Sequence, residues 1–248
     1  MELKKNEQID DLQINDLKII QNKDGFCFGI DAVLLSNFAR IKKGQTAVDL
    51  GTGTGIIPIL MAGKSNAKKV IGIEIQEEVA SMAKRSVILN NMEDKVEILN
   101  QDLVNIDKVL GVHKYDVVTS NPPYMHKNGL INENDKKAIS RHEIKCNLED
   151  VMKSASRLLK YNGKFFMINR VIRLADIIIL GRKYNLEPKR IRFVHPKKDK
   201  APNLLLIQFT KDAKPELKME DPLYVYNEDN TYTQQINKIY SSEKIGVI

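Results

Sequence analysis

The pattern of apolar and polar residues along this chain alternates regularly between one typical of strands and one typical of helices. Short apolar runs of strand length alternate with longer stretches in which apolar residues return every three or four positions, as in helices. The predicted strands are Thr46–Leu50, Val70–Glu74, Val96–Leu99 and Tyr115–Ser120, and the predicted helices start near Ile56 and span Glu77–Asn90. This alternation predicts an α/β fold with a parallel, doubly wound sheet.

The second half continues the pattern and then changes it. We expect a helix capped by Asn147 that runs through Leu159 and stops at Gly163, followed by a strand over Lys164–Asn169 and a helix over Ala175–Tyr184. Two further apolar runs, Lys189–His195 and Asn203–Phe209, are joined by the loop 196–202. They predict an antiparallel hairpin that closes the sheet.

The N-terminal residues form a separate pattern. Leu17–Gln21 predicts a short strand, residues 22–25 a turn, and Asp31–Ala39 a helix with Asp31 at its cap. We therefore expect an N-terminal extension over residues 1–44, a main domain over 45–212, and a C-terminal tail over 213–248 packed on or near that domain.

Composition narrows the classes of protein. The chain has 248 residues, a charged N-terminus and no apolar run of about 18 residues, so we expect a cytoplasmic protein that is not bound to a membrane. Cys27 and Cys146 are isolated from each other and from clustered histidines, which favours packing roles over a disulfide or a metal site.

The positive charge is concentrated in one segment. The whole chain carries +7, while residues 182–200 contain eight Lys or Arg against two acids, which gives +6. A localised basic block is typical of a surface that meets a phosphate backbone, here through Lys197, Lys198 and Lys200. A solvated Lys-rich surface explains the same composition.

A glycine-rich loop follows the first strand of the main domain. The run starts at Asp49 and places Gly51, Gly53 and Gly55 before an apolar helix start, which allows the backbone to approach a ligand closely. A dinucleotide fingerprint would need glycine at Ile56, and a phosphate-binding P-loop would need glycine at Pro58. Neither type of phosphate loop therefore fits.

The fourth strand ends in Asn121-Pro122-Pro123-Tyr124, at the sheet edge where ligands of α/β proteins bind. An amine conjugated to a planar ring is a poor nucleophile, and acceptors that hold its two hydrogens make it more tetrahedral. The Asn121 side-chain oxygen and the Pro122 carbonyl can be these acceptors, and Tyr124 offers a face for stacking a base. A rigid turn with a surface tyrosine would be the plain alternative.

The loop resembles the D-x-G-x-G-x-G loop of class I S-adenosylmethionine-dependent methyltransferases, and Asn121-Pro-Pro-Tyr resembles the signature of those that methylate planar nitrogen. The resemblance implies a Rossmann-like, mostly parallel sheet of seven strands with an antiparallel C-terminal hairpin strand. It also implies S-adenosylmethionine as cofactor, with S-adenosylhomocysteine as product. Glu74 would bind the ribose hydroxyls, Asp102 the adenine amine and Asp49 the methionine ammonium, while Ile75 and Leu103 would flank the adenine ring. The implied cofactor-binding residues are Asp49, Gly51, Thr52, Gly53, Gly55, Glu74, Ile75, Asp102, Leu103 and Asn121.

Over nearly its whole length the chain resembles the bacterial tRNA(Val) adenine-N6 methyltransferases. The shared features are residues 28–35, the Asn121-Pro-Pro-Tyr motif, the Arg141-His142-Glu143 triplet and the tail over 222–232. The resemblance implies methylation of adenosine 37 in a tRNA partner, without a metal. The candidate substrate-binding residues are Phe26, Phe28, Pro123, Tyr124, Arg141, His142, Lys197, Lys198 and Lys200.

Other functions remain open. Protein-glutamine methyltransferases share both motifs, but that group has a sizeable helical N-terminal domain, whereas 48 residues precede Asp49 here. Nucleic-acid enzymes that methylate other adenine or guanine amines are a second alternative, although a DNA enzyme usually needs extra length to read the major groove. A catalytically silent protein that binds cofactor or RNA is the non-enzyme alternative, and the intact Asn121 argues against it.

Overall fold

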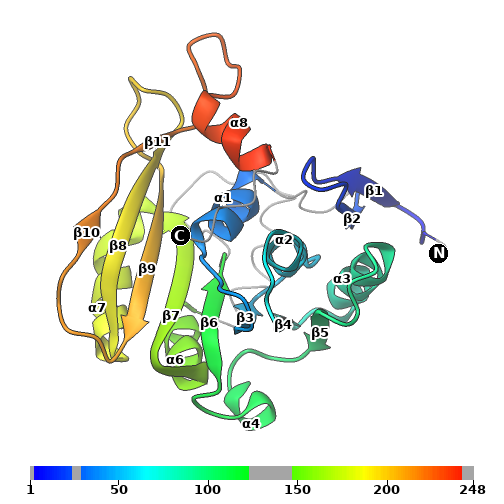
Figure 1. Cartoon of the computed structure of the whole chain (residues 1–248), viewed down its shortest axis with the longest axis horizontal. Coiled ribbons are helices and arrows are strands. Elements are labelled where there is room, and N and C mark those ends of the chain that lie inside the picture. Colours follow the sequence, from blue (N-terminus) through cyan, green and yellow to red (C-terminus); the bar gives the residue numbers. More distant parts are fainter. Residues whose placement is uncertain (1–2, 24–28, 123–146, 242–248) are drawn as a thin grey trace.

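The computed structural model describes residues 3–23, 29–122 and 147–241. Its central sheet contains nine strands in these residues: β3 (Thr46–Leu50), β4 (Lys69–Glu74), β5 (Val96–Asn100), β6 (Tyr115–Ser120), β7 (Leu159–Arg170), β8 (Leu186–His195), β9 (Leu204–Lys211), β10 (Lys218–Met219) and β11 (Leu223–Tyr224). The order across the sheet is β10-β8-β9-β7-β6-β3-β4-β5, and β11 also pairs with β8. The expected α/β fold is confirmed (Figure 1).

Strand direction decides where a site can form. Strands β3 to β7 pair in parallel, and β9 runs antiparallel to both β7 and β8. The carboxyl ends of β3, β4, β5, β6 and β8 therefore meet at one edge of the sheet. The expected C-terminal hairpin is confirmed as β8 and β9. The expected count of seven strands is two short of the nine observed, because the two-residue strands β10 and β11 are too short to give a sequence pattern.

Helices cover both faces of the sheet. On one face lie α1 (Ile30–Phe38), α2 (Ile56–Lys64) and α3 (Glu77–Leu89), and on the other lie α6 (Leu148–Leu158) and α7 (Leu174–Lys183). Neighbouring residues of β7 anchor the two layers, because successive side chains of a strand point to opposite faces. Phe166 meets Phe38 of α1 edge to face at 5.9 Å between ring centroids, while Phe165 stacks on Phe209 of β9 at 6.0 Å.

The N-terminal residues pair with themselves and then pack on α3. Strands β1 (Glu7–Asp11) and β2 (Lys18–Asn22) form an antiparallel hairpin, which is joined to α3 by an ion pair between Glu7 and Arg85 at 2.5 Å. The sequence predicted β2 but missed β1, because its mixture of charged and polar residues shows no apolar alternation. The prediction that Asp31 caps the next helix is wrong, since Gly29 is the N-cap and no side chain bonds there.

The segment after residue 147 follows the prediction at its start and departs from it at its end. Asn147 caps α6 through a capping box with Asp150, as its residue type predicts. Gly163 does not end the helix: α6 stops at Leu158 and Gly163 lies inside β7. A Cβ at Gly163 would lie 2.9 Å from the Lys160 carbonyl oxygen, so the glycine serves a close backbone approach within the strand.

Within the main domain, two short helical segments were not predicted. They are α4 (Asp107–Leu110) and the 3-10 turn Val171–Arg173, which leads directly into α7. Each is too short to show a helical period in the sequence.

The described part of the tail lies against the sheet. Its strands β10 and β11 pair in parallel with β8, and its helix α8 (Gln234–Tyr240) buries Ile236 and Ile239 in the same apolar cluster as α1 and α2. The boundaries at residues 44/45 and 212/213 stay predictions. None of the helices in the described residues is long and apolar enough to cross a membrane.

The tight contact between α7 and β9 gives a test of the packing. A Cβ at Gly181 would lie 2.5 Å from Cε1 of the buried Phe209 ring. Although alanine favours helix, we expect Gly181→Ala to lower the free energy of unfolding by about 1 kcal/mol or more, because overpacking costs about 1 to 3 kcal/mol. Urea denaturation measures this, with Ile179→Ala at an exposed position of the same helix as the control expected to change little. Equal stability of the Gly181 variant and wild type would show that this interface can relax.

Candidate active site

The glycine loop joins β3 to α2 in the conformation that its residues predict. Gly51, Gly53 and Gly55 all have positive φ angles, of 73°, 58° and 90°. A Cβ at Gly51 or Gly53 would meet no atom within 4 Å, whereas a Cβ at Gly55 would lie 3.2 Å from that of Ala83 in α3. The first two glycines therefore border open space that a ligand can enter, and Gly55 permits close packing of α2 on α3.

Asp49 lies beneath this loop, at the end of β3. Its side chain is fully buried and its Oδ1 accepts a hydrogen bond of 2.6 Å from Thr119 Oγ1 of β6. By strict geometry its Oδ2 and the buried hydroxyl of Thr52 in the loop make no hydrogen bond among the described residues, although the Thr52 hydroxyl is close enough to lower the pKa of Asp49. Burial raises the pKa of the Asp49 carboxyl to about 6, and the nearby charge of Glu74 adds to the shift.

Glu74 ends β4 and holds the loop from the other side. Its Oε2 accepts the Gly53 N–H at 3.0 Å and its Oε1 accepts the Gln76 N–H at 2.9 Å. The side chain is buried, Oε1 also accepts the Gln76 side-chain amide at 3.5 Å, and Oε2 has a second lone pair beyond its bond to Gly53. The prediction that Glu74 binds ribose hydroxyls is compatible with these contacts, but nothing in the structure tests it.

The end of β5 supplies the third acid. Asp102 is exposed and its Oδ1 accepts the Val104 N–H at 2.8 Å, which orders the turn after the strand. Asn100 was not predicted as a site residue. Its amide donates to the carbonyls of Glu74 and Ile75 at 2.9 and 3.0 Å, and so fixes the chain where an adenine ring is expected. An asparagine at the last position of a strand was the available signal.

The two predicted hydrophobic neighbours of the adenine ring lie on these turns. Ile75 and Leu103 are both half-buried, and each directly follows one of the acidic residues Glu74 and Asp102. Their placement is compatible with the predicted role.

Asn121 and Pro122 follow β6 directly and are half-buried. Leu50 of β3 pairs with Ser120 in the register of the two strands, so Asn121 lies one position beyond the end of the strand beside Asp49. The structure thus brings the glycine loop and the first half of the Asn-Pro-Pro-Tyr motif to adjacent strand ends. Six of the predicted substrate-binding residues lie outside the described residues: Phe26, Phe28, Pro123, Tyr124, Arg141 and His142.

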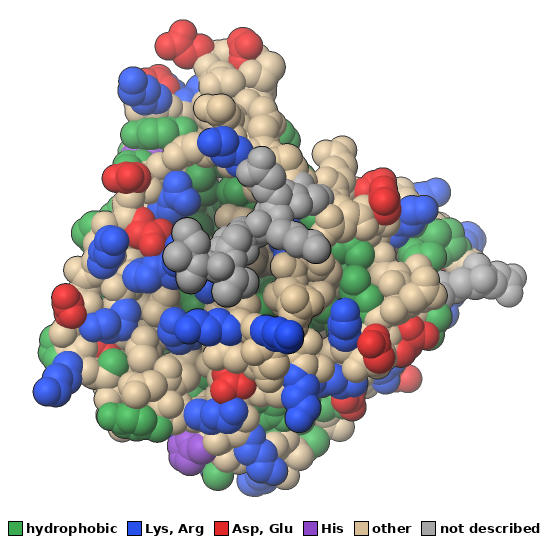
Figure 2. Space-filling model, in the orientation of Figure 1, with side chains coloured by type: hydrophobic (Ala, Val, Ile, Leu, Met, Phe, Trp, Pro, Cys, Tyr) green, Lys and Arg blue, Asp and Glu red, His purple; other side chains and the backbone are tan. Residues whose placement is uncertain are grey.

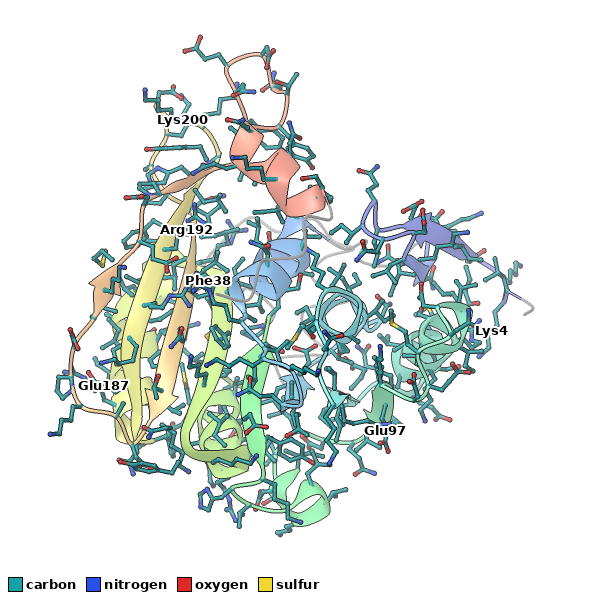
Figure 3. All side chains as sticks on the ribbon, viewed as in Figure 1. Lys4, Phe38, Glu97, Glu187, Arg192 and Lys200 are labelled. Carbon is teal, nitrogen blue, oxygen red and sulfur yellow. The ribbon has the colours of Figure 1, made fainter. Side chains whose placement is uncertain are left out.

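Lys197, Lys198 and Lys200 lie in the loop between β8 and β9, which is at the same edge of the sheet as Asn121. Since β8 is three strands from β6, the loop is displaced sideways by about 14 Å. Figure 3 shows Lys200 at this end of the molecule and Glu187 at the opposite end. Lys197 Nζ donates to the Glu228 carbonyl at 3.0 Å, and Lys200 pairs with Asp199 at 3.2 Å.

Acidic residues neutralise much of the remaining basic block. Two pairs link parts of the main domain, Arg182 with Glu187 and Lys183 with Glu149, and two link β8 to the tail, Lys189 with Glu216 and Arg190 with Glu220. The charge that is concentrated in the sequence is therefore partly balanced in the folded protein.

The chemistry of this edge fits S-adenosylmethionine. A carboxylate oxygen of Asp49 and the hydroxyl of Thr52 are buried and make no well-formed hydrogen bond among the described residues, beside a loop whose glycines leave space. An ammonium group can satisfy the Asp49 carboxylate, and a cofactor without phosphates needs room rather than anion donors. No group of three or more potential metal ligands occurs in the described residues.

Comparison with known proteins identifies the family. The model of the methyltransferase small domain matches residues 29–180, more than half of the chain. The chain therefore belongs to the methyltransferase small domain family. It is an S-adenosylmethionine-dependent methyltransferase, as the glycine loop and its acids predict.

Similar proteins resemble the chain over most of its length. A Bacteroides thetaiotaomicron protein named tRNA1(Val) (adenine(37)-N6)-methyltransferase is 28% identical over 88% of this chain and 92% of its own. A protein of the same name from Histophilus somni is 27% identical over 89% and 91%. The resemblance to this group that the sequence features predict is confirmed.

Solved structures show the same fold. The crystal structure of a predicted O-methyltransferase from Agrobacterium tumefaciens has a TM-score of 0.70 at 21% identity and covers 86% of this chain and 96% of its own. A ribosomal protein L11 methylase from Lactobacillus delbrueckii subsp. bulgaricus has a TM-score of 0.51 at 18% identity and covers 73% and 78%. At these identities the likeness concerns the fold alone.

The raised pKa of Asp49 predicts a pH dependence. Because the folded protein holds this proton more tightly than the unfolded chain, ionising Asp49 lowers stability as the pH rises from about 4 to about 6. An ammonium ligand prefers the ionised carboxylate. We therefore expect the affinity for S-adenosylhomocysteine to rise by up to tenfold per unit as the pH rises toward 6, and to level off above it.

Calorimetric titrations between pH 5 and 8 measure this dependence. Asp49→Asn, which keeps the shape but cannot ionise, should bind more weakly with little change over this range. A wild-type affinity that is flat from pH 5 to 7 would contradict the role of Asp49 as the ammonium partner.

Proposed function

We propose that this methyltransferase acts on the exocyclic N6 amine of an adenosine in tRNA, and that the nucleotide is adenosine 37 of tRNA(Val). The observation that carries the proposal is the position of Asn121 and Pro122 at the end of β6, beside the glycine loop and Asp49. The names of relatives that match 88 to 89% of the chain support the choice of substrate. A tRNA substrate would place the protein in the cytoplasm.

The residues at the strand end act on the amine rather than on the methyl group. When bound, S-adenosylmethionine supplies an electrophilic methyl group on a sulfonium. The Asn121 side-chain oxygen and the Pro122 carbonyl accept the two amine hydrogens, which turns the nitrogen lone pair out of conjugation and toward the methyl group. Asn121 cannot act as a general base, so the proton leaves with or after methyl transfer.

In this proposal, one set of residues binds the cofactor and another set binds the target base. Asp49, Glu74 and Asp102 hold the cofactor through its ammonium, ribose and adenine groups, with Thr52 beside Asp49. Tyr124 stacks the target base after it leaves its own stack, and Pro123 fixes the turn that presents it. Phe26 and Phe28 line the base pocket.

The remaining substrate-binding residues contact the parts of the RNA that lie outside the base pocket. Arg141 and His142 meet phosphate or base, and Lys197, Lys198 and Lys200 meet phosphates further along the RNA. The position of the β8–β9 loop at the Asn121 edge supports the last assignment.

Replacing Asn121 tests the amine clamp. Asn121→Ala should reduce methyl transfer by on the order of 100-fold, because one transition-state contact is lost, while affinity for S-adenosylhomocysteine stays within a few fold. Asn121→Asp keeps an oxygen acceptor and should recover part of the rate. Single-turnover kinetics and calorimetry provide the two measurements, with Asn66→Ala at an exposed turn as the control. Full activity of Asn121→Ala would refute the clamp.

Transfer of labelled methyl to unmodified total tRNA tests the substrate. We expect N6-methyladenosine in one tRNA species as the labelled nucleoside. Label at another amine, or in a different tRNA, would correct the position while keeping the chemistry. Label in protein instead of tRNA would refute the tRNA assignment and favour a glutamine amide, and binding of cofactor without any transfer would indicate a silent protein.

A further inference from the structure

One face of strands β7, β8 and β9 is divided into an apolar half and a polar half. Toward the carboxyl ends of β7 and β8, the face carries Phe166, Ile168, Val194, Leu204 and Leu206, all buried in the cluster that includes α1 and α8. Toward the other end, the same alternating positions are Lys164, Arg190, Gln208 and Thr210. Figure 3 shows Phe38 of α1 and Arg192 over this face of the strands.

The polar half does not arise because the strands run past the end of the hydrophobic core. On the opposite face, Phe165, Phe209 and Ile191 lie buried at this level with residues of α6 and α7, and a charged residue, Lys211, appears only at the last position of β9. Strand β9 runs antiparallel to β7 and β8, and antiparallel strands commonly carry one polar face. On this half-face Gln208 is buried, whereas Lys164, Arg190 and Thr210 are half-buried, so their polar groups remain accessible for binding.

Positive charges converge on this polar half. Lys164 is half-buried on β7, and Lys42, Arg190 and Arg40 all act on it as like charges. Burial and this repulsion lower the pKa of Lys164. Arg40 and Lys42 are exposed and follow α1. Figure 2 shows Lys and Arg side chains in a band across this side of the molecule.

Three of these cations have no acidic partner among the described residues: Arg40, Lys42 and Lys164. Arg190, by contrast, pairs with Glu220 at 2.7 Å, donates to Gln208 at 2.7 Å and lies over the Phe38 ring at 4.6 Å. We call the three unpaired cations, Arg40, Lys42 and Lys164, the sheet-face cluster. Arg190 lies beside it, but its charge is balanced by Glu220.

A groove runs beside the cluster. It has a volume of about 550 Å³ and lies between the strands, through Lys189, Gln208 and Thr210, and the tail residues Glu216, Leu217 and Lys218. Because Glu216 pairs with Lys189 at 3.8 Å, Lys218 and the neutral polar side chains are what continue the surface away from the cluster. An extended polyanion can use such a row of contacts, whereas a single small anion would meet only part of it.

We propose that the sheet-face cluster of Arg40, Lys42 and Lys164 binds the phosphodiester backbone of the RNA substrate. Phosphates supply the negative charge that the fold does not provide, and their repetition along a strand suits cations spread over two elements. The lining is polar and cationic rather than aromatic, which disfavours a protein partner. The proposal rests on the proposed function, because it takes RNA as the substrate.

This surface differs from the lysines of the β8–β9 loop. The loop residues lie at the carboxyl edge, whereas Lys164 pairs in register with Val117, three residues before the end of β6. All three cluster residues also lie outside the basic segment 182–200, and two of them, Arg40 and Lys42, lie in the connection after α1. An RNA that meets both surfaces would extend from the active-site edge down one side of the sheet.

The salt dependence of tRNA binding tests the proposal. We would measure the affinity of wild type and of the triple variant Arg40→Gln/Lys42→Gln/Lys164→Gln for an unmodified tRNA transcript by fluorescence anisotropy over a range of salt concentrations. Each lost phosphate contact reduces the slope of log affinity against log salt by about 0.7 to 0.9. We expect the triple variant to bind more weakly, with a slope smaller by about 2.

A matched control separates this surface from general charge. Lys84→Gln/Lys108→Gln/Lys153→Gln removes the same charge from exposed positions on α3, α4 and α6, and should leave the slope unchanged. Calorimetry with S-adenosylhomocysteine shows whether each variant keeps its fold. If Lys164→Gln disturbs folding, the exposed pair Arg40→Gln/Lys42→Gln should still reduce the slope by about 1 to 2.

Two outcomes would refute the surface: a slope equal to wild type in folded cluster variants, or the same loss in the control variant. A wild-type protein that binds no tRNA would refute it as well. Methyl transfer is measured with the same tRNA. Binding with the expected slopes but without transfer refutes the proposed function and keeps the surface, whereas transfer with unchanged slopes does the reverse.

Discussion

The Asp49 carboxylate is fully buried at the end of β3, and its one hydrogen bond, of 2.6 Å, comes from Thr119 on β6. The bond ties the strand that leads into the glycine loop to the strand that leads into Asn121. Burial raises the pKa of this carboxyl to about 6, and because its second oxygen makes no well-formed hydrogen bond among the described residues, the ionised form destabilises the empty site. The empty site therefore lacks a countercharge at the position where the ammonium group of the cofactor is expected. The same carboxylate joins the two halves of the active site, the glycine loop after β3 and Asn121 after β6.

The glycine loop is held from below by this strand pair and from the side by β4. Gly51 and Thr52 N–H groups donate to the Ile73 carbonyl at 3.0 and 2.9 Å, and Gly53 donates to Glu74. The loop is thus placed by backbone contacts, and its glycines are free to face a ligand. Rigid support of this kind is what a cofactor site requires, because misplacement of reacting groups by about 1 Å slows a reaction strongly.

Sequence reasoning predicted the elements with strong periodicity and missed those that depend on tertiary contacts. The predicted strand Thr46–Leu50 and the helix cap at Asn147 agree with the structure, since an apolar run and a capping residue act locally. Strand β1 has no apolar pattern and is held by its hairpin partner and Arg85. Gly163 resembles a helix stop, but it lies within β7, where its missing side chain allows a close approach to the Lys160 carbonyl of the same strand.

The candidate site shows the same division. The motif residues at strand ends were predictable because parallel strands bring their carboxyl ends together. Asn100 was not, because its role is to bond the backbone of the neighbouring strand. The charge of residues 182–200 was misleading as a count, because its partners include Glu216 and Glu220 of the tail. Unpaired charge is a property of the folded chain and cannot be summed along a sequence window.

The pairing of the tail with β8 has a consequence for the solubility of the protein. Strand β8 would otherwise be the outer strand of the sheet, with a row of unpaired backbone N–H and C=O groups that could join a strand of another molecule. Strands β10 and β11 satisfy parts of this row, and the charged side chains of Arg190 and Glu220 pair across it. The tail therefore protects the edge of the sheet from association with another molecule. This protection depends on two short strands, β10 and β11, that pair with β8 over only two residues each.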